Sequence, residues 1–206
     1  MRRFFAIALA LAAFSGAHAQ AVPYEVKVAD GKLAGVRDGD VASFKGIPFA
    51  APPVGELRWK PPQPVKPWDG VRAADKYGAI CEQKYNAQDN GVGPLPKSED
   101  CLTLNVFAPA TSRSAPVMVW IHGGGFVNGS GTAALYYGTA LARQGVVVVT
   151  LNYRLGRFGF FAHPALTSEA GGAPVGNYGL MDIIAALRWV HANIESFGGY
   201  PRQTTI

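Results

Sequence analysis

Residues 117–131 of the 206-residue chain read VMVWIHGGGFVNGSG, and this stretch indicates a strand followed directly by a sharp turn. The apolar run Val117–Ile121 is typical of a strand that is buried on both faces of a sheet. Three glycines, Gly123–Gly125, follow it after one residue, and glycine lets the backbone turn and bring its N–H groups close to a ligand. Two successive N–H groups aimed at one point bind an anion. An ordinary glycine turn is the alternative interpretation.

The segments around this stretch predict further strands and a long helix. Two apolar runs, LTLNVFAP at residues 102–109 and GVVVVTLNYR from Gly145, are strand candidates. Residues 179–199, GLMDIIAALRWVHANIESFGG, predict a helix that ends at its glycine pair and is followed by Pro201. Its apolar residues recur at three- and four-residue steps and predict one apolar stripe: Leu180, Ile183, Ile184, Leu187, Val190, Ile194 and Phe197. The last five residues, RQTTI, begin another strand.

The amino-terminal part of the chain predicts short antiparallel strands. Asp30-Gly31 and Asp38-Gly39 are tight-turn signals between alternating stretches of residues 24–50. Residues 51–70 are rich in proline, which excludes a helix or a central strand, and their tryptophans favour an ordered extended loop. The predicted fold class is α/β: antiparallel strands lead into a mostly parallel sheet with flanking helices, and we expect the fold to be incomplete.

The first 19 residues have the layout of a secretory signal peptide. Two arginines precede an apolar run, Phe4–Phe14, and the small-residue pattern Ala17-His18-Ala19 follows. The run is too short to span a bilayer, so we expect cleavage after Ala19, export to the periplasm or the cell exterior, and no stable membrane insertion. Residues 20–206 then form part of a single domain.

Charge and cysteine content limit the possible partners. The formal net charge is +5, and the Lys and Arg residues of the mature chain are scattered without a basic run, which argues against a nucleic-acid partner. Cys81 and Cys101 are the only cysteines, and in an exported chain an even pair is typical of a disulfide. Free thiols or a metal site are the alternatives, and two cysteines without a nearby histidine make a poor metal site.

Five blocks of the sequence resemble type-B carboxylesterases, the α/β-hydrolase family that includes the cholinesterases. These blocks are FKGIPFAAPPVGELRWKPP, SEDCLTLNVFAP, VMVWIHGGGFVNGS, VVVVTLNYRLGRFGF and GNYGLMDIIAALRWVHANIESFGG. The motif that begins at His122, H-G-G-G, matches the oxyanion loop of esterases and lipases. The resemblance implies an incomplete α/β-hydrolase fold and a serine esterase that hydrolyses small carboxylic esters without a metal or an organic cofactor.

The resemblance also implies roles for individual residues. Gly124 and Gly125 would donate two N–H groups to the oxyanion hole, which stabilises the negative oxygen of the tetrahedral intermediate. The remaining roles are structural and comprise a disulfide between Cys81 and Cys101, an ion pair of Arg58 with Glu99, and an ion pair of Arg154 with Asp182.

The catalytic triad of such an esterase does not occur in the 206 residues. G-x-S-x-G is absent, and Ser130 lies in a Gly-Ser-Gly of the wrong spacing, so we interpret it as a loop residue. His122, His163 and His191 all precede the point in the chain where the family's base occurs. We therefore expect an amino-terminal fragment that ends just before the nucleophile and is inactive by itself. A non-catalytic binding or adhesion protein of this fold, or a truncated inactive remnant, is the alternative.

Some residues depart from the family pattern or bear on the substrate. Ile183, Tyr200 and Thr204 stand where Gln, Asp and Val are usual in the family, and the sequence gives no reason for Tyr200. Tyr85 is the only aromatic residue between the two cysteines, and this segment contains no Trp. Because cholinesterases stack a Trp of this segment on the quaternary ammonium, its absence argues against choline esters. The sequence does not predict the oligomeric state.

Overall fold

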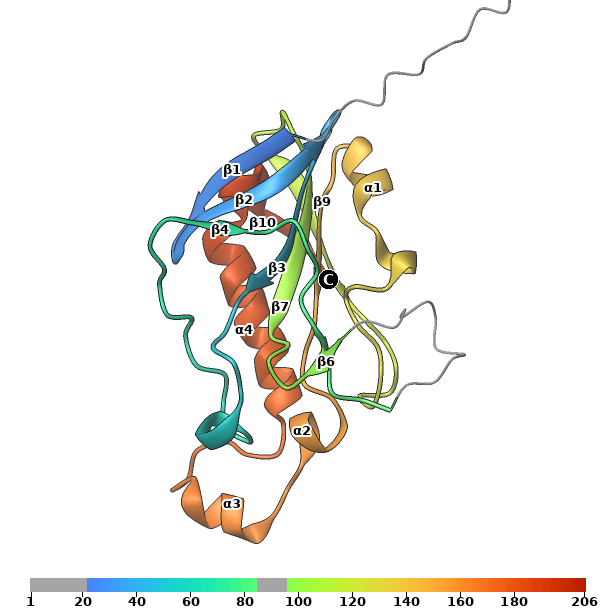
Figure 1. The fold of residues 1–206 in the computed structure, drawn as a ribbon. Coiled ribbons are helices and arrows are strands. Elements are labelled where there is room, and N and C mark those ends of the chain that lie inside the picture. Colours follow the sequence, from blue (N-terminus) through green and yellow to red (C-terminus); the bar gives the residue numbers. More distant parts are fainter. Residues whose placement is uncertain (1–21, 85–95) are drawn as a thin grey trace, which may run out of the picture.

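A mixed β-sheet with helices on both faces forms most of the computed structural model, which describes residues 22–84 and 96–206 (Figure 1). The strands of this sheet are β1 Val22–Val28, β2 Gly31–Asp38, β3 Val41–Pro48, β4 Val71–Ala73, β7 Thr103–Pro109, β8 Ala115–Ile121, β9 Val147–Leu151 and β10 Gly199–Thr205. Their order is β1-β2-β3-β7-β9-β8-β10, with β4 beside β2. Two short strands, β5 Ile80–Cys81 and β6 Lys97–Ser98, pair separately. The expected signal peptide and Tyr85 lie outside the described residues.

The strand pairing confirms the expected order of antiparallel and then parallel strands. β1 and β2 form one hairpin and β2 and β3 another. β8 pairs in parallel with both β9 and β10. The antiparallel part extends farther along the chain than the apolar runs indicated, because β7 is antiparallel to both of its neighbours, β3 and β9. The sheet of this α/β fold is therefore mixed.

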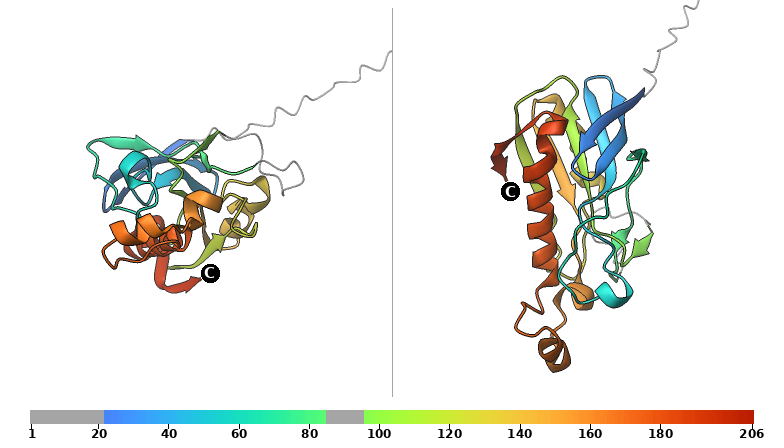
Figure 2. Two further views of the ribbon diagram at one scale, coloured as in Figure 1. Left: turned by 90° about the horizontal axis from the view of Figure 1, so that it is seen from below. Right: turned by 90° about the vertical axis from the view of Figure 1, so that its left-hand side faces the viewer.

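Helices cover the two faces of the sheet separately. They are α1 Thr139–Arg143, α2 Gly156–Phe160, α3 Pro164–Glu169 and α4 Tyr178–Asn193, with short 3₁₀ segments at Gly55–Leu57, Ala134–Tyr136 and Ile194–Phe197. Figure 2 shows α4 running along one face of the sheet, where Ala186 and Val190 share the largest core cluster with Val149 of β9. On the other face, Ala142 of α1 packs with Val148. Because adjacent strand residues face opposite ways, β9 is buried on both faces.

Two predictions of burial were wrong in part. Leu180 and Ile184 of the expected apolar stripe are 41% and 49% exposed. The buried face of α4 includes Gly179, Asp182 and Ala186 instead, because a polar contact described below turns Asp182 toward the core. On β8, Trp120 is 42% exposed, so this strand is buried on one face only among the described residues.

The carboxyl ends of β8, β9 and β10 meet at one edge of the sheet because these three strands are parallel. The predicted strand after α4 is confirmed: Thr204 and Thr205 of β10 pair with Val117 and Met118 of β8. The register shifts before Thr204, in the segment that contains Pro201, which has no N–H to donate. Within residues 22–84 and 96–206, no helix has the length and apolarity needed to cross a membrane.

Candidate functional site

The glycine run forms a left-handed turn at the carboxyl end of β8. Gly124, Gly125 and Phe126 have φ angles of 116°, 59° and 63°, a region that residues other than glycine rarely adopt. The carbonyl oxygen of Gly124 accepts hydrogen bonds from the N–H groups of Val127 (3.1 Å) and Asn128 (3.3 Å). Within the described parts of the chain, the N–H groups of Gly124 and Gly125 have no hydrogen-bond acceptor. This geometry leaves two adjacent donors available to one anionic oxygen.

His122 orients the first of these donors. Its Nδ1 lies 2.8 Å from the carbonyl oxygen of Gly123, and Nδ1 must carry the proton because a carbonyl oxygen can only accept. In a trans peptide the C=O and the next N–H point in opposite directions, so holding the Gly123 carbonyl also holds the N–H of Gly124. The imidazole stacks on the ring of Tyr153, with centroids 4.4 Å apart, and the hydroxyl of Tyr153 donates to the carbonyl of His122 at 3.0 Å.

The imidazole of His122 is 3% exposed, and its Nε2 has no partner among the described residues. Burial lowers the pKa of His122 to about 4, against a smaller opposite effect of the hydrogen bond to Gly123. The folded protein therefore keeps this side chain neutral throughout the neutral and mildly acidic range. A neutral His122 preserves the Nδ1 hydrogen bond without adding positive charge beside the glycine turn.

We expect His122 to make the protein less stable as the pH falls from 6.5, its ordinary pKa, to about 4. In this window His122 binds a proton in the unfolded chain but not in the folded protein. The free energy of unfolding is therefore highest above pH 6.5 and decreases progressively below it. The loss is on the order of 3 kcal/mol. Urea unfolding near neutral pH and at about pH 4.5 should show a smaller loss for His122→Asn than for the unchanged protein. His191→Asn, on the exposed side of α4, should behave like the unchanged protein; equal losses in all three would contradict the prediction.

The loop that follows β9 holds the glycine turn in place. The side-chain oxygen of Asn152 accepts from the N–H of Gly131 at 2.9 Å and from the hydroxyl of Ser130 at 3.1 Å. The N–H of Gly156 donates to the carbonyl of Phe126 at 2.7 Å. Ser130 is 1% exposed, which agrees with a loop residue and not with a nucleophile that must reach a substrate. The two loops therefore form one hydrogen-bonded unit.

Gln83 connects this unit to the disulfide. Its side-chain amide makes two bonds to the backbone of Gly129: Nε2 donates to the carbonyl, and Oε1 accepts from the N–H, both at 2.8 Å. Gln83 lies two residues after Cys81, whose sulfur is bonded to that of Cys101. The structure thus places the two cysteines in a disulfide that restrains the segment behind the glycine turn.

The structure places Arg154 and Asp182 in a buried ion pair between the loop after β9 and α4. Nε and Nη2 of Arg154 donate to the two carboxylate oxygens at 2.8 and 2.7 Å, and the backbone N–H of Arg154 donates at 3.0 Å. The side chains are 3% and 0% exposed. Nη1 donates to the carbonyl of Lys60 at 2.9 Å, so the pair also holds the proline-rich loop. Burial raises the pKa of the Asp182 carboxyl, and the bonds from Arg154 oppose that effect.

Arg58 and Glu99 form the second ion pair that the sequence implied. Nε and Nη2 of Arg58 donate to the two carboxylate oxygens of Glu99, which joins the proline-rich loop to the cysteine segment. These side chains are 39% and 21% exposed, so water screens this pair far more than the buried one.

The other two histidines that the structure describes lie away from the glycine turn. His163 caps the start of α3, where its Nδ1 accepts from the N–H of Ala165 at 3.2 Å, and His191 is exposed on α4. In the part of the chain that the structure describes, no three His, Cys, Asp or Glu side chains lie close enough together to hold a metal ion.

In a comparison with known protein families, the sequence model of the Carboxylesterase family matches residues 22–206 of the chain. The chain is 49% identical over 178 residues to the fumonisin B1 esterase of Sphingopyxis macrogoltabida, a match that covers 85% of the chain and 33% of that protein. It is 50% identical over 179 residues to the para-nitrobenzyl esterase of Bacillus subtilis (strain 168), covering 85% and 36%. An acetylcholinesterase of Electrophorus electricus is 47% identical over 176 residues, covering 81% and 27%. The chain spans about a third of the length of these curated relatives.

Solved structures show the same relationship. A thermophilic PNB esterase matches with a TM-score of 0.80 and 46% identity, covering 87% of the chain and 37% of that protein. Another PNB esterase matches with a TM-score of 0.79 and 47% identity, covering 86% and 36%. The segment matched by the family model includes the glycine turn, both cysteines and all four residues of the two ion pairs.

Proposed function

Because the chain belongs to the Carboxylesterase family, we propose that the whole protein hydrolyses carboxylic esters through a serine nucleophile. The observation that carries this proposal is the pair of free N–H donors, those of Gly124 and Gly125, at the carboxyl end of a central parallel strand. In open α/β sheets, ligands bind at this edge of the strands. A protein that only bound its partners would not need two oriented donors at this position.

In the proposed reaction, a serine oxygen attacks the ester carbonyl carbon and the carbonyl oxygen becomes negative. The N–H groups of Gly124 and Gly125 stabilise that oxygen, the alcohol leaves with a proton, and water then releases the acid from the acyl-enzyme. Each such donor contributes roughly 3 kcal/mol to lowering the barrier. His122 acts indirectly, because it holds the peptide group that carries the N–H donor of Gly124.

The position of β10 supports this arrangement. The 206 residues contain no G-x-S-x-G, so the serine, its acid and its base would belong to further chain. β10 is the parallel neighbour of β8, and Thr205 pairs with Met118, three residues before the end of β8 at Ile121. A strand continuing in this register would place a strand-to-helix turn beside the glycine turn, where a nucleophile and an oxyanion hole must meet.

The two ion pairs and the disulfide have a supporting role in this proposal. Arg154 and Asp182 fix the start of the loop that carries Asn152 and Tyr153, both of which bond the glycine segment. Glu99 and the disulfide restrain the segment from which Gln83 reaches Gly129. The oxyanion donors are thus positioned by a network of buried or half-buried contacts, and not by the glycines alone.

The substrate class we propose is small carboxylic esters other than choline esters. The names of the relatives include fumonisin B1, para-nitrobenzyl and acetylcholine esterases, so similarity of this level does not select one ester. The segment between the cysteines contains no Trp to stack on a quaternary ammonium, and it lies partly outside the described residues. We also propose export, because the disulfide suits an oxidising compartment and the first 19 residues read as a signal peptide.

We expect the protein expressed from its complete gene to hydrolyse p-nitrophenyl acetate and to lose this activity after treatment with an organophosphate, which phosphorylates an active serine. Residues 20–206 expressed alone should show no turnover, because they hold the oxyanion donors without a nucleophile. Mass spectrometry of the exported protein should give Gln20 as its first residue. A folded, exported protein without ester hydrolysis would support the non-catalytic alternative, and organophosphate-sensitive turnover by residues 20–206 alone would contradict the assignment of the nucleophile.

A further inference from the structure

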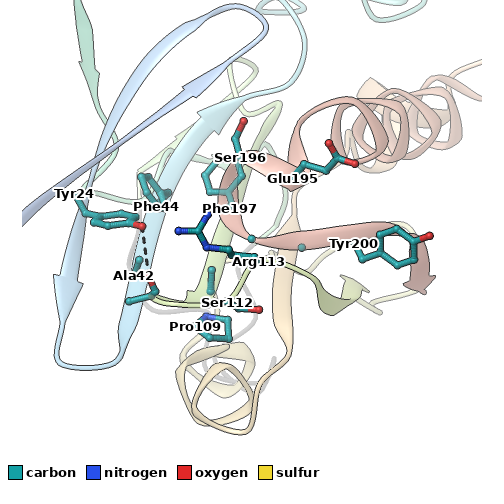
Figure 3. Close-up of a pocket in the computed structure, with 14 residues that line it drawn as sticks. Tyr24, Ala42, Phe44, Pro109, Ser112, Arg113, Glu195, Ser196, Phe197 and Tyr200 are labelled. Atoms are coloured by element: carbon teal, nitrogen blue, oxygen red, sulfur yellow. Dashed lines mark hydrogen bonds between the residues drawn. The ribbon is translucent and has the colours of Figure 1, made fainter.

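A hollow of about 390 Å³ lies at the opposite end of β8 from the glycine turn (Figure 3). It is bounded by β1, β3, the turn between β7 and β8, the 3₁₀ segment Ile194–Phe197 and the start of β10. A seven-residue strand is roughly 20 Å long, so this hollow is a separate place from the candidate active site. Its volume is within the range of sites for small molecules.

The sequence creates this hollow with small residues above an aromatic floor. Ala42 of β3 pairs across the strands with Ala108 of β7, so neither strand places a large side chain in the space at this pair. Gly198 has a φ of 79°, and a Cβ there would lie 2.2 Å from the carbonyl oxygen of Ser112, so the backbone segments approach closely on this side. Phe44 and Phe197 form the floor with their rings edge to face, 4.9 Å apart.

Among the described residues that line this hollow, Arg113 is the one cation, and its side chain is exposed. Within residues 22–84 and 96–206 it has no ion pair, hydrogen bond or aromatic contact. Figure 3 shows its guanidinium turned toward Tyr24 and Phe197, and the carboxylate of Glu195 turned away from it. A guanidinium presents parallel N–H donors that match the two oxygens of a carboxylate.

Two tyrosines complete the surroundings of Arg113. The hydroxyl of Tyr24 donates to the carbonyl of Ala110 at 3.4 Å, a long bond that it can exchange for a better acceptor. Tyr200 lies on the rim at the start of β10, and Glu195 is the one acidic residue among those lining the hollow.

We propose that this hollow binds a small aromatic carboxylate, with the carboxylate on the Arg113 guanidinium and the ring against the half-buried ring of Tyr24. The charge of Arg113 selects the carboxylate, and the ring of Tyr24 favours a flat apolar body. This site does not depend on the proposed esterase function, because it shares no residue with the glycine turn.

Benzoate is a suitable probe, and benzamide is its uncharged counterpart of the same shape. Calorimetric titration of the protein expressed from its complete gene should detect benzoate and not benzamide. Arg113→Gln should weaken benzoate binding about tenfold or more, because it removes a charge-assisted bidentate pair. Arg202→Gln removes the same charge from an exposed residue of β10 outside the hollow, so benzoate should bind as before. Tyr200→Asp should weaken binding by adding a negative charge to the rim, and Glu195→Gln should strengthen it by removing one.

Three results would overturn the proposal. The first is no benzoate binding by the unchanged protein up to about 10 mM, which is the weak end of specific affinity. The second is equal binding by the unchanged protein and Arg113→Gln, which is also the result expected if benzoate enters the active site instead. The third is equal binding of benzamide and benzoate, which would show that charge does not select the ligand.

Discussion

Replacing Asp182 with Asn should lower the free energy of unfolding by about 3–5 kcal/mol, because Arg154 would keep a buried positive charge without a counter-charge. Both side chains are almost completely buried, and three hydrogen bonds from Arg154 end on this one carboxylate. Asn has nearly the same shape as Asp, so the loss reflects charge and not a cavity. Urea unfolding followed by tryptophan fluorescence measures it.

Two further variants test whether the loss of stability depends on the burial of this ion pair or only on the presence of two opposite charges. Glu99→Gln removes the same kind of charge from the half-exposed partner of Arg58, and its effect on stability should be far smaller. The double variant Arg154→Met with Asp182→Leu removes both buried charges and should recover much of the stability lost in Asp182→Asn. Equal losses for Asp182→Asn and Glu99→Gln would show that burial does not decide the cost.

The same buried pair explains why the face of α4 could not be predicted from apolar periodicity. The pattern gives a helix correctly, because apolar residues recur at helical spacing over its whole length. It cannot show that Asp182 points inward, since that depends on an arginine 28 residues earlier in the chain. A Cβ on Gly179 would lie 2.5 Å from the carbonyl of Arg154, so this face of the helix approaches the loop too closely for large side chains. Leu180 and Ile184 are therefore turned outward.

In the sheet, too, the pairings set by neighbouring residues could be predicted and those set by distant residues could not. Both amino-terminal hairpins could be predicted, because Asp-Gly turns fix the pairing of neighbouring strands. The direction of β7 could not, since an apolar run reads the same whether its neighbours are parallel or antiparallel. The exposure of Trp120 also depends on which helix covers β8, and α1 packs mainly on β3, β7 and β9.

At the candidate site, the glycines could be found from the sequence and most of their supports could not. Asn152 and Tyr153 follow a buried strand directly, and polar residues at that position are a usual sign of a site, so this signal was available. Gln83 carried no signal, because its partner Gly129 is 46 residues away and no local pattern links the two. Free N–H donors depend on φ angles and on the absence of acceptors, which only coordinates reveal.

The departures from the family pattern have physical consequences in the structure. Ile183 is half-buried and packs against the main core cluster, where an apolar side chain is at home. The hydroxyl of Thr204 donates to the carbonyl of Pro201 at 2.9 Å, within the segment where the register of β10 shifts. Tyr200 lies on the rim of the hollow that contains Arg113, so the residue that the sequence left unexplained belongs to a feature far from the glycine turn.

Replacing Gly124 with Ala should reduce kcat for p-nitrophenyl acetate by about 10²–10³-fold, if the protein has the esterase function proposed above. Gly124 has a φ of 116°, and a Cβ on it would lie 2.0 Å from the carbonyl oxygen of Asn128. The turn must shift to relieve this contact, and the shift moves the N–H of Gly124 away from the oxyanion. Because a displaced donor affects the transition state more than the ground state, the loss should fall on kcat and not on KM.

The neighbouring glycines provide matched controls within the same turn. Gly123 has no positive φ, and a Cβ on it would meet no atom within 4 Å, so Gly123→Ala should keep nearly full activity. Gly125 has a φ of 59° with open space around it, so Gly125→Asn should be tolerated better than Gly124→Ala, since Asn enters this region more readily than Ala. Urea unfolding of each variant shows whether it is folded when kcat is measured. A folded Gly124→Ala protein with full activity, or equal losses at Gly123 and Gly124, would mean that this turn does not hold the oxyanion.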